Sequence, residues 1–282
     1  MSDFGRKIQS SRLSWGILKF MMTTDSRVPR SAAAFGLRID PTGTHLSSTL
    51  KLEELRALLA RRPVPATEGN YRAAIVDQNL LGKPTGSARR ITFERLRELY
   101  ALDPGLLVFR TLDDLWDADA SAQPMISLLC STARDPILRA MTPFLLRLPI
   151  GATVGTHELA EEAEHQFPGK FVASSRERLG RNVSSSWKKA GLLLGRRTKK
   201  RVKPLARPTS LAYALLLGDL CGKRGQALFM TLWAAMLDAP IHELKELAVV
   251  ASRQGWIEYK ASGDVVEVSF RHLMRDQGES AP

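Results

Sequence analysis

The sequence predicts a mainly α-helical protein, a helical bundle followed by winged-helix-like units with short β-hairpin wings. Apolar residues recur at helical spacing through most of the 282 residues. Prolines at positions 104, 124, 136 and 240 stand where apolar runs begin, as proline does in the first turn of a helix. Alternating, strand-like patterns are confined to residues 196–205 and 256–270. We therefore expect many helices and little sheet.

The first 43 residues are expected to form an N-terminal helix and an arm. Residues 1–24 fit one amphipathic helix, and residues 25–43 are rich in Pro, Gly, Ser and Arg, which is typical of a loop or an extended connection. The apolar stretch around Trp15 is interrupted by Lys19 and is followed by no small-residue cleavage site. A signal peptide is therefore not expected.

Residues 44–150 are predicted to form a helical bundle. Five leucines between residues 47 and 61 fall on one helical face, and the prolines at 63 and 65 end that helix. Further helices are expected over residues 71–81 and 87–100, with Ile91 on the apolar face of the second, and after each of the prolines at 104, 124 and 136. The last two helices are apolar enough to be central.

Residues 151–207 follow the order of a winged helix-turn-helix. Thr156 is suited to cap a helix that ends near Phe167, and a turn leads to a long basic helix that reaches Leu194. Gly195 ends this helix, and alternating residues around a run of cations follow. In this interpretation residues 176–190 are the recognition helix and residues 196–203 are the wing.

Residues 208–274 repeat that order with little net charge. Apolar helices are expected over residues 210–221 and 226–237, and Pro240 opens a third that ends at Gly255. Two alternating strands, 256–260 and 264–270, are joined by Ala-Ser-Gly, which indicates a hairpin. This unit is predicted to contact another protein or a second copy of the chain, and residues 275–282 are predicted to be a frayed tail.

The excess positive charge is local. The chain has 41 lysines and arginines against 29 acidic residues, a formal net charge of +12. Thirteen of these cations and a single acid, Glu177, lie within residues 170–207, so the rest of the chain holds 28 of each sign. Such a concentration of positive charge favours binding of a polyanion, because each phosphate that the protein neutralises releases condensed counterions. Double-stranded DNA is the predicted partner.

The long basic helix can present one apolar and one polar face. Leu179, Val183, Trp187 and Leu194 suit docking on the domain. Arginine and asparagine read guanine and adenine edges, whereas serine and lysine typically contact phosphates, so Asn182 is the expected base reader. The candidate DNA-binding residues are Arg176, Arg178, Arg181, Asn182, Ser185, Lys188, Lys189, Arg196, Arg197, Lys199, Lys200, Arg201 and Lys203. The alternatives are a solubilising cationic surface and a site for an acidic protein.

No motif for catalysis, a metal or a cofactor is complete. His157-Glu158 begins a zincin-like pattern without its second histidine, and residues 82–87 contain P-loop residue types in the wrong order. Ser185 to Lys188 matches SxxK without its companion motifs. Asp113, Asp114, Asp117 and Asp119 could hold Mg²⁺ in a nuclease, but a solvated helix end is favoured. We predict a protein that is not an enzyme and needs no cofactor.

The cysteines and tryptophans bear on the predicted cellular compartment and on the form of DNA that is bound. Cys130 and Cys221 are far apart in sequence and form no CxxC, so reduced core thiols in a cytoplasmic protein are expected. The apolar runs are too short to span a bilayer. The five tryptophans are not interleaved with the cations, as a single-strand stacking platform requires, so duplex DNA is favoured.

Three short segments resemble the BrxA family, accessory proteins of bacterial BREX phage-defence systems. They are the Ala-Arg-Arg-Ile stretch at 88–91, the Leu-Leu-Cys stretch at 128–130, and the segment 174–193, Ser-Ser-Arg-Glu-Arg-Leu to Trp-Lys-Lys-Ala-Gly-Leu-Leu. The resemblance covers about residues 70–205. It implies an all-helical, non-enzymatic DNA-binding protein that works beside a methyltransferase and an ATPase in antiviral defence. The C-terminal hairpin unit departs from the smaller members of that family, and it could contact other defence proteins.

Three other functions remain open at this point. A transcriptional regulator would use the same cations on a defined operator, and a palindromic footprint would favour it. A scaffold for an acidic protein or RNA would have no duplex affinity at physiological salt. An enzyme would need a metal at the aspartate cluster 113–119. The sequence leaves open the DNA sequence recognised, the partner proteins and the oligomeric state.

Overall fold

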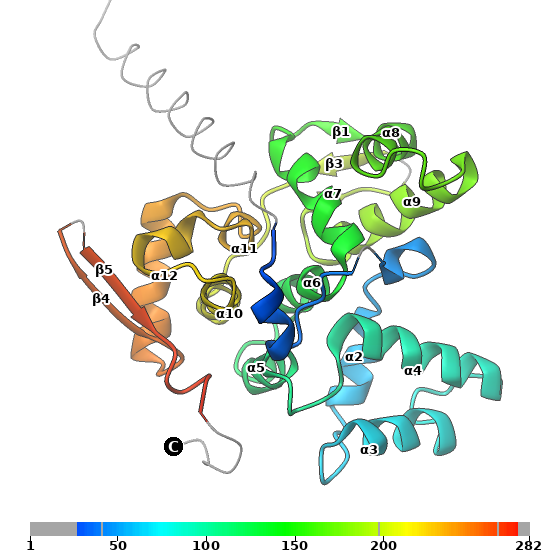
Figure 1. Cartoon of the computed structure of the whole chain (residues 1–282), viewed down its shortest axis with the longest axis horizontal. Coiled ribbons are helices and arrows are strands. Elements are labelled where there is room, and N and C mark those ends of the chain that lie inside the picture. Colours follow the sequence, from blue (N-terminus) through cyan, green and yellow to red (C-terminus); the bar gives the residue numbers. More distant parts are fainter. Residues whose placement is uncertain (1–26, 41, 197, 264, 276–282) are drawn as a thin grey trace, which may run out of the picture.

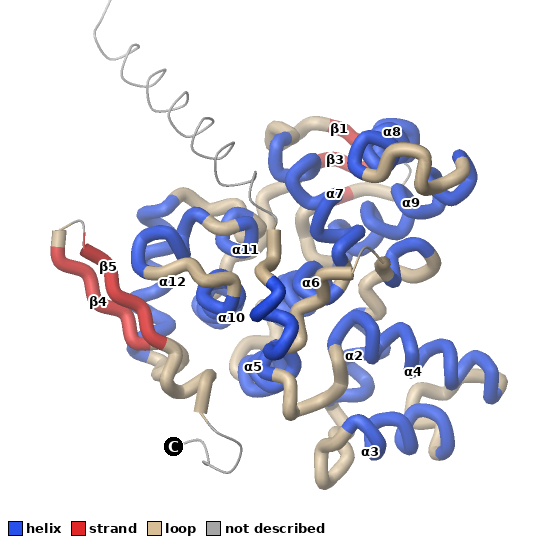
Figure 2. The backbone as a smooth tube through the Cα atoms, viewed as in Figure 1, coloured by secondary structure: helices blue, strands red, loops and turns tan. Residues whose placement is uncertain are grey.

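The computed structural model describes residues 27–275 except 41, 197 and 264, and in this part it is mainly helical with two small antiparallel sheets (Figures 1 and 2). The helix predicted over residues 1–24 and the tail after Arg275 lie outside the described residues. One continuous cluster of buried apolar side chains extends from Ala32 to Leu273. The predicted units therefore share a core. No described helix is long and apolar enough to cross a membrane.

The N-terminal half consists of short helices around that core. Its elements are η1 (Arg30–Phe35), η2 (Thr44–Leu46), α2 (Leu52–Leu59), α3 (Glu68–Arg72), the π-helical turn η3 (Ala73–Asp77), α4 (Gly86–Tyr100), α5 (Leu107–Trp116), α6 (Gln123–Arg134) and α7 (Pro136–Arg147). Side-chain oxygens of Thr67, Thr85 and Asp135 cap α3, α4 and α7 by accepting backbone N–H groups of the first turn. The prolines at 124 and 136 stand in the first turns of α6 and α7, as predicted.

One predicted core residue of α4 is on the surface. Ile91 is 57% exposed, whereas Phe93, Leu96 and Tyr100 are buried. Positions 93, 96 and 100 share a helical face, and position 91 lies two residues, or about 200°, away from Phe93. The prediction that Ile91 faces the core is therefore wrong, although the helix itself is where the sequence places it.

Two arginines, Arg134 (half-buried) and Arg139 (buried), bind carbonyl oxygens at the ends of helices. Arg134 donates to the carbonyls of Gly36, Arg97 and Glu98, and Arg139 donates to those of Thr132, Ala133 and Arg38. The last carbonyls of a helix have no partner within it, so these guanidinium groups close the ends of α4 and α6. Burial lowers the pKa of Arg139 to about 10, which leaves it charged at neutral pH.

The unit around α9 is held together by a three-stranded sheet. It comprises β1 (Thr153–Val154), α8 (Thr156–Gln166), α9 (Ala173–Lys189), β2 (Leu193–Leu194) and β3 (Lys199–Arg201), and the strand order is β1-β3-β2. Lys200 pairs with Thr153 on one side and Leu194 on the other. A β-carbon at Gly180 of α9 would lie 2.9 Å from that of Leu159, so glycine permits the close approach of α8.

Two boundaries in this region differ from the prediction. The basic helix was expected to reach Leu194, but α9 ends at Lys189, and Leu193 and Leu194 form β2. Gly191 adopts a positive φ of 79°, which ends a helix readily. Helix α7, assigned from the sequence to the bundle, packs on α8 (Figure 1). It therefore belongs structurally to this unit as well.

The C-terminal unit surrounds helix α10, almost all of which is buried. Its elements are α10 (Pro208–Leu220), η4 (Gly225–Met230), α11 (Leu232–Ala235), α12 (Ile241–Arg253), β4 (Glu258–Ser262) and β5 (Val265–Ser269). The predicted hairpin is present, with Lys260 opposite Glu267 (Figure 2). The single helix expected over 226–237 is instead a 3-10 turn and a short helix. Extended backbone at Thr231 separates them, and its side chain caps α11.

Candidate nucleic-acid interface

Helix α9 presents a straight polar stripe on the side opposite its buried face. Leu179, Val183 and Trp187 are fully buried. Arg178, Arg181, Ser185 and Lys188 follow one another at spacings of three and four residues, which aligns them along the helix. The three cations of this stripe are exposed and Ser185 is half-buried. The stripe therefore has the composition and geometry expected of a helix that contacts nucleic acid.

The hairpin β2–β3 adds cations beside the C-terminal end of α9. Lys199 Nζ donates to Ser184 Oγ of α9 over 2.6 Å, while Arg196 and Lys200 are exposed. Burial and the neighbouring charge of Lys188 both lower the pKa of Lys199. Two ammonium groups from different elements are thus close together.

The turn between the two strands depends on glycine. Gly195 has a φ of 106°, a left-handed conformation that disfavours a side chain. A β-carbon there would also lie 2.2 Å from the carbonyl oxygen of Thr198. Gly195 therefore fixes the turn that leads from β2 to β3, the strand from which Lys199 reaches α9.

The last cations of the basic segment are engaged in the fold. Arg201 is fully buried, pairs with Asp238 in the loop before α12, and donates to the carbonyl of Leu192. Lys203 pairs with Glu243 of α12 over 3.0 Å. Arg201 and Lys203 therefore join the basic unit to the C-terminal unit, and Arg201 cannot reach a phosphate in this structure.

Asn182, the expected base reader, also faces the protein. Its Nδ2 donates to the carbonyl oxygen of His45 over 2.9 Å. Arg176 pairs with Glu164 of α8, and Arg181 lies 3.6 Å from Glu177 within α9. The N-terminal half of the predicted recognition helix is therefore partly neutralised or turned inward. Arg197 lies outside the described residues.

We use the term cationic face for the exposed or half-buried cations at the C-terminal end of α9 and on the hairpin. These are Lys188, Lys189, Arg196, Lys199 and Lys200. Within the described residues, none of them forms an ion pair with an acidic side chain. The Nζ of Lys189 instead donates to the hydroxyl of Thr49 over 3.0 Å. Uncompensated charge is thus concentrated at the C-terminal end of α9 and on the hairpin.

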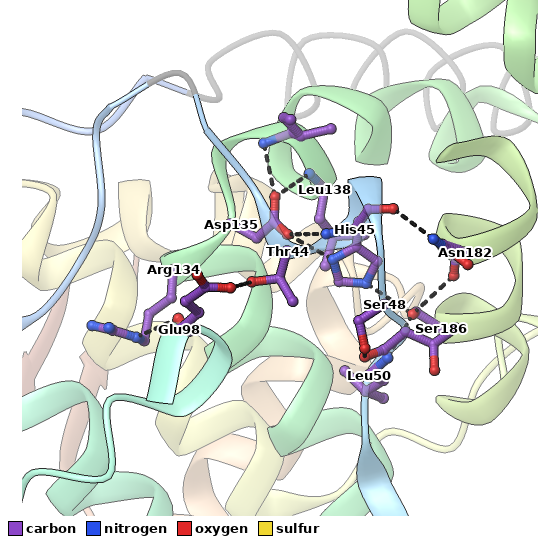
Figure 3. Close-up of polar contacts among 12 residues, drawn as sticks. Thr44, His45, Ser48, Leu50, Glu98, Arg134, Asp135, Leu138, Asn182 and Ser186 are labelled. Carbon is purple, nitrogen blue, oxygen red and sulfur yellow. Dashed lines mark hydrogen bonds and ion pairs between the residues drawn. The ribbon is translucent and has the colours of Figure 1, made fainter. Parts of the chain in front are cut away.

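A buried polar chain that the sequence analysis missed holds α9 in position (Figure 3). Asp135 Oδ2 lies 2.7 Å from His45 Nδ1, and His45 Nε2 lies 2.8 Å from Ser186 Oγ. Asp135 also accepts the backbone N–H groups of His45, Ile137 and Leu138. The chain therefore links η2, the start of α7 and the buried face of α9.

This chain has the residue types of a nucleophilic triad but not its accessibility. His45 and Ser186 are 0% exposed, and Asp135 is 1% exposed. The Ser186 hydroxyl accepts the backbone N–H of Leu50 and lies 3.0 Å from the carbonyl oxygen of Asn182. A substrate has no access to this hydroxyl, so the geometry supports positioning and not catalysis. In the sequence only Asp135, before Pro136, carried a signal, that of a helix cap.

The aspartate cluster considered for Mg²⁺ is neutralised by arginines. The pairs are Asp113 and Asp117 with Arg62, Asp114 with Arg275, and Asp119 with Arg207. No group of three potential metal-ligating residues occurs among the described residues. His157 pairs with Glu161 on the surface of α8. These residues therefore behave as structural ion pairs in this fold.

Comparisons with known proteins add no assignment: no family model, no curated protein and no solved structure matches this chain.

Proposed function

We propose that the chain is a non-catalytic protein that binds duplex DNA through the cationic face, and that α7 to β3 form a winged-helix unit. The order helix, strand, helix, helix, hairpin supports the winged-helix interpretation, as does a sheet in which β1 pairs with β3 and not with β2. In such a unit α9 is the helix that meets the duplex and β2–β3 is the wing.

The observation that carries the proposal is the absence of acidic partners on the cationic face. Lys188, Arg196 and Lys200 project from adjacent elements and form no ion pair among the described residues. Like charges held together repel one another, and a phosphate backbone relieves that repulsion while releasing counterions. A protein surface evolved only for solubility would be expected to mix both signs.

The biological setting of this binding is proposed from the resemblance of three sequence segments to the BrxA family. An accessory role in phage defence requires binding to many sequences, whereas a transcriptional regulator requires a defined operator. The engagement of Asn182 with His45 favours the first role, because it removes the expected base reader. A protection footprint on a mixed genomic library distinguishes the two: a sequence-blind pattern supports the accessory role and a palindrome supports a regulator.

Charge reversal at Lys200 tests the proposal. We expect Lys200→Glu to weaken binding to a random duplex of about 30 base pairs at least tenfold in about 0.1 M salt, because it removes a phosphate contact and adds repulsion. Fluorescence anisotropy of a labelled duplex measures this change.

Lys203→Glu is the matched control for Lys200→Glu. Lys203 belongs to the same basic segment and is exposed, but it pairs with Glu243 away from the cationic face. We expect the charge reversal at Lys203 to change the affinity for the duplex less than about threefold, because it acts only through the net charge of the protein. Equal losses in both variants, or a wild-type chain with no duplex affinity, would contradict the proposal.

A further inference from the structure

We infer that the duplex backbone lies against the C-terminal half of α9 and the β2–β3 hairpin, and that the acidic helix α8 keeps it away from the N-terminal end of α9. This inference rests on the proposed DNA binding and specifies how the duplex is oriented on the protein. It predicts that contacts with the backbone dominate and that contacts with base edges contribute little.

The N-terminal end of α9 lies in an acidic environment. Glu161 and Glu164 of α8 and Glu177 of α9 line, with His157 and Arg176, a hollow of about 310 Å³ between the two helices. Glu161 and Glu177 are 68% and 58% exposed. Of the three arginines of this end, Arg176 and Arg181 are paired with glutamates, and only Arg178 forms no ion pair among the described residues. A phosphate backbone brought here would therefore meet no net positive charge.

The opposite end of α9 carries only cations. Lys188 and Lys189 end the helix, and the hairpin places Lys199 beside α9, while Lys200, the next residue of β3, points to the opposite face of the sheet, near Gly151. None of these four side chains forms an ion pair with an acidic residue within the described part of the chain. Burial lowers the pKa of Lys189, and the carboxylates of Glu54 and Glu53 oppose this shift. Both carboxylates are already paired, Glu54 with Lys51 and Lys83 and Glu53 with Arg56.

The two ends are far enough apart to act independently. Glu177 and Lys188 are eleven residues apart in the same helix, which corresponds to about 16 Å along its axis. The Debye length at physiological salt is about 8 Å, so each end presents its own field to a duplex. The difference in charge between the two ends of α9 therefore orients the duplex, because the duplex does not experience the helix as a single net charge.

The contacts that α9 makes within the protein agree with DNA binding in which base edges are not read. Asn182 and Ser186, in the middle of the helix, are bound to His45. Arg178 and Arg181, the two arginines of the stripe, lie near the acidic end: Arg178 follows Glu177 in the sequence and Arg181 pairs with it. Binding should consequently vary little among random sequences and depend strongly on salt.

Two double variants of the full chain test the orientation, and each removes two exposed cations from α9. We expect Lys188→Ala/Lys189→Ala to weaken binding to a random duplex of about 30 base pairs by more than thirtyfold in about 0.1 M salt. The slope of log K against log salt should fall in magnitude by about 1.8, since each lost phosphate contact contributes about 0.9. We expect Arg178→Ala/Arg181→Ala to weaken binding less than about threefold with the slope unchanged.

A third variant examines the acidic end directly. Glu161→Gln/Glu177→Gln should raise affinity less than about threefold if the backbone stays more than a Debye length away. Circular dichroism of each variant confirms that α9 remains folded. A larger loss from the arginine pair than from the lysine pair, or a large gain from the glutamine pair, would overturn the orientation while leaving DNA binding intact. Absence of wild-type binding would instead overturn the proposed function, and the orientation with it.

Discussion

Replacing Arg201 by alanine is expected to lower the free energy of unfolding by about 3–5 kcal/mol, because it leaves a carboxylate buried without its partner. Arg201 is 0% exposed and the side chain of Asp238 is 5% exposed, so water cannot take the place of either member of the ion pair. The guanidinium also donates to the carbonyls of Leu192 and Val202, which would lose that donor. Urea denaturation followed by circular dichroism measures the change.

Lys203→Ala provides the matched comparison for Arg201→Ala. Both residues link the basic segment to the C-terminal unit, but the Lys203 and Glu243 side chains are half exposed. An exposed pair of this kind contributes about 0–1 kcal/mol. A variant with Arg201→Ala that unfolds at the same urea concentration as Lys203→Ala would show that the buried pair does not hold the units together.

Replacing Asp135 by alanine is expected to have an effect of similar size, about 3–5 kcal/mol. The substitution removes the cap of α7, and it leaves the buried backbone N–H and ring of His45 without an acceptor. Asp135→Asn retains an oxygen that can cap the helix, so we expect a smaller loss of about 2 kcal/mol. Equal stabilities of the alanine variant and the wild type would contradict the role assigned to the buried chain.

The stabilisation by Asp135 should also depend on pH. Burial opposes ionisation, but the proximity of His45 and several hydrogen bonds lower the pKa of Asp135 below its ordinary value. A carboxyl group with a lowered folded-state pKa contributes fully above its unfolded pKa of about 3.9, and the contribution is lost as the pH falls through the folded value. The stability difference between wild type and Asp135→Ala should therefore be constant from pH 7 to about pH 5 and shrink in stronger acid. A difference that persists unchanged in strong acid would argue against an ionised Asp135.

Local signals in the sequence were sufficient to predict many elements. The prolines in the first turns of α6 and α7 and Gly263 in the turn of the C-terminal hairpin each act within a few residues. Helix periodicity placed α4 correctly even though Ile91 was assigned to the wrong face. Backbone preferences of this kind depend on neighbours in the chain, so they can be deduced without the fold.

Whether an individual polar side chain is buried or exposed could not be deduced in the same way. Arg201 and Lys200 are adjacent and chemically alike in the sequence, yet one is buried against Asp238 and the other is exposed. Asn182 fits the pattern of a base reader, but its partner His45 lies 137 positions earlier. Strand alternation in β3 and contacts between distant segments decide which cations remain available, and neither is visible in the charge run itself.

The salt dependence of duplex binding by the wild-type chain tests the central claim most directly. Anisotropy titrations of a random duplex of about 30 base pairs across a salt series should give a linear fall of log K with log salt. With about five phosphates contacted by the cationic face, we expect a slope of about −4 to −5. No binding at low salt, or a slope shallower than about −1, would contradict the claim that these cations bind a phosphate backbone.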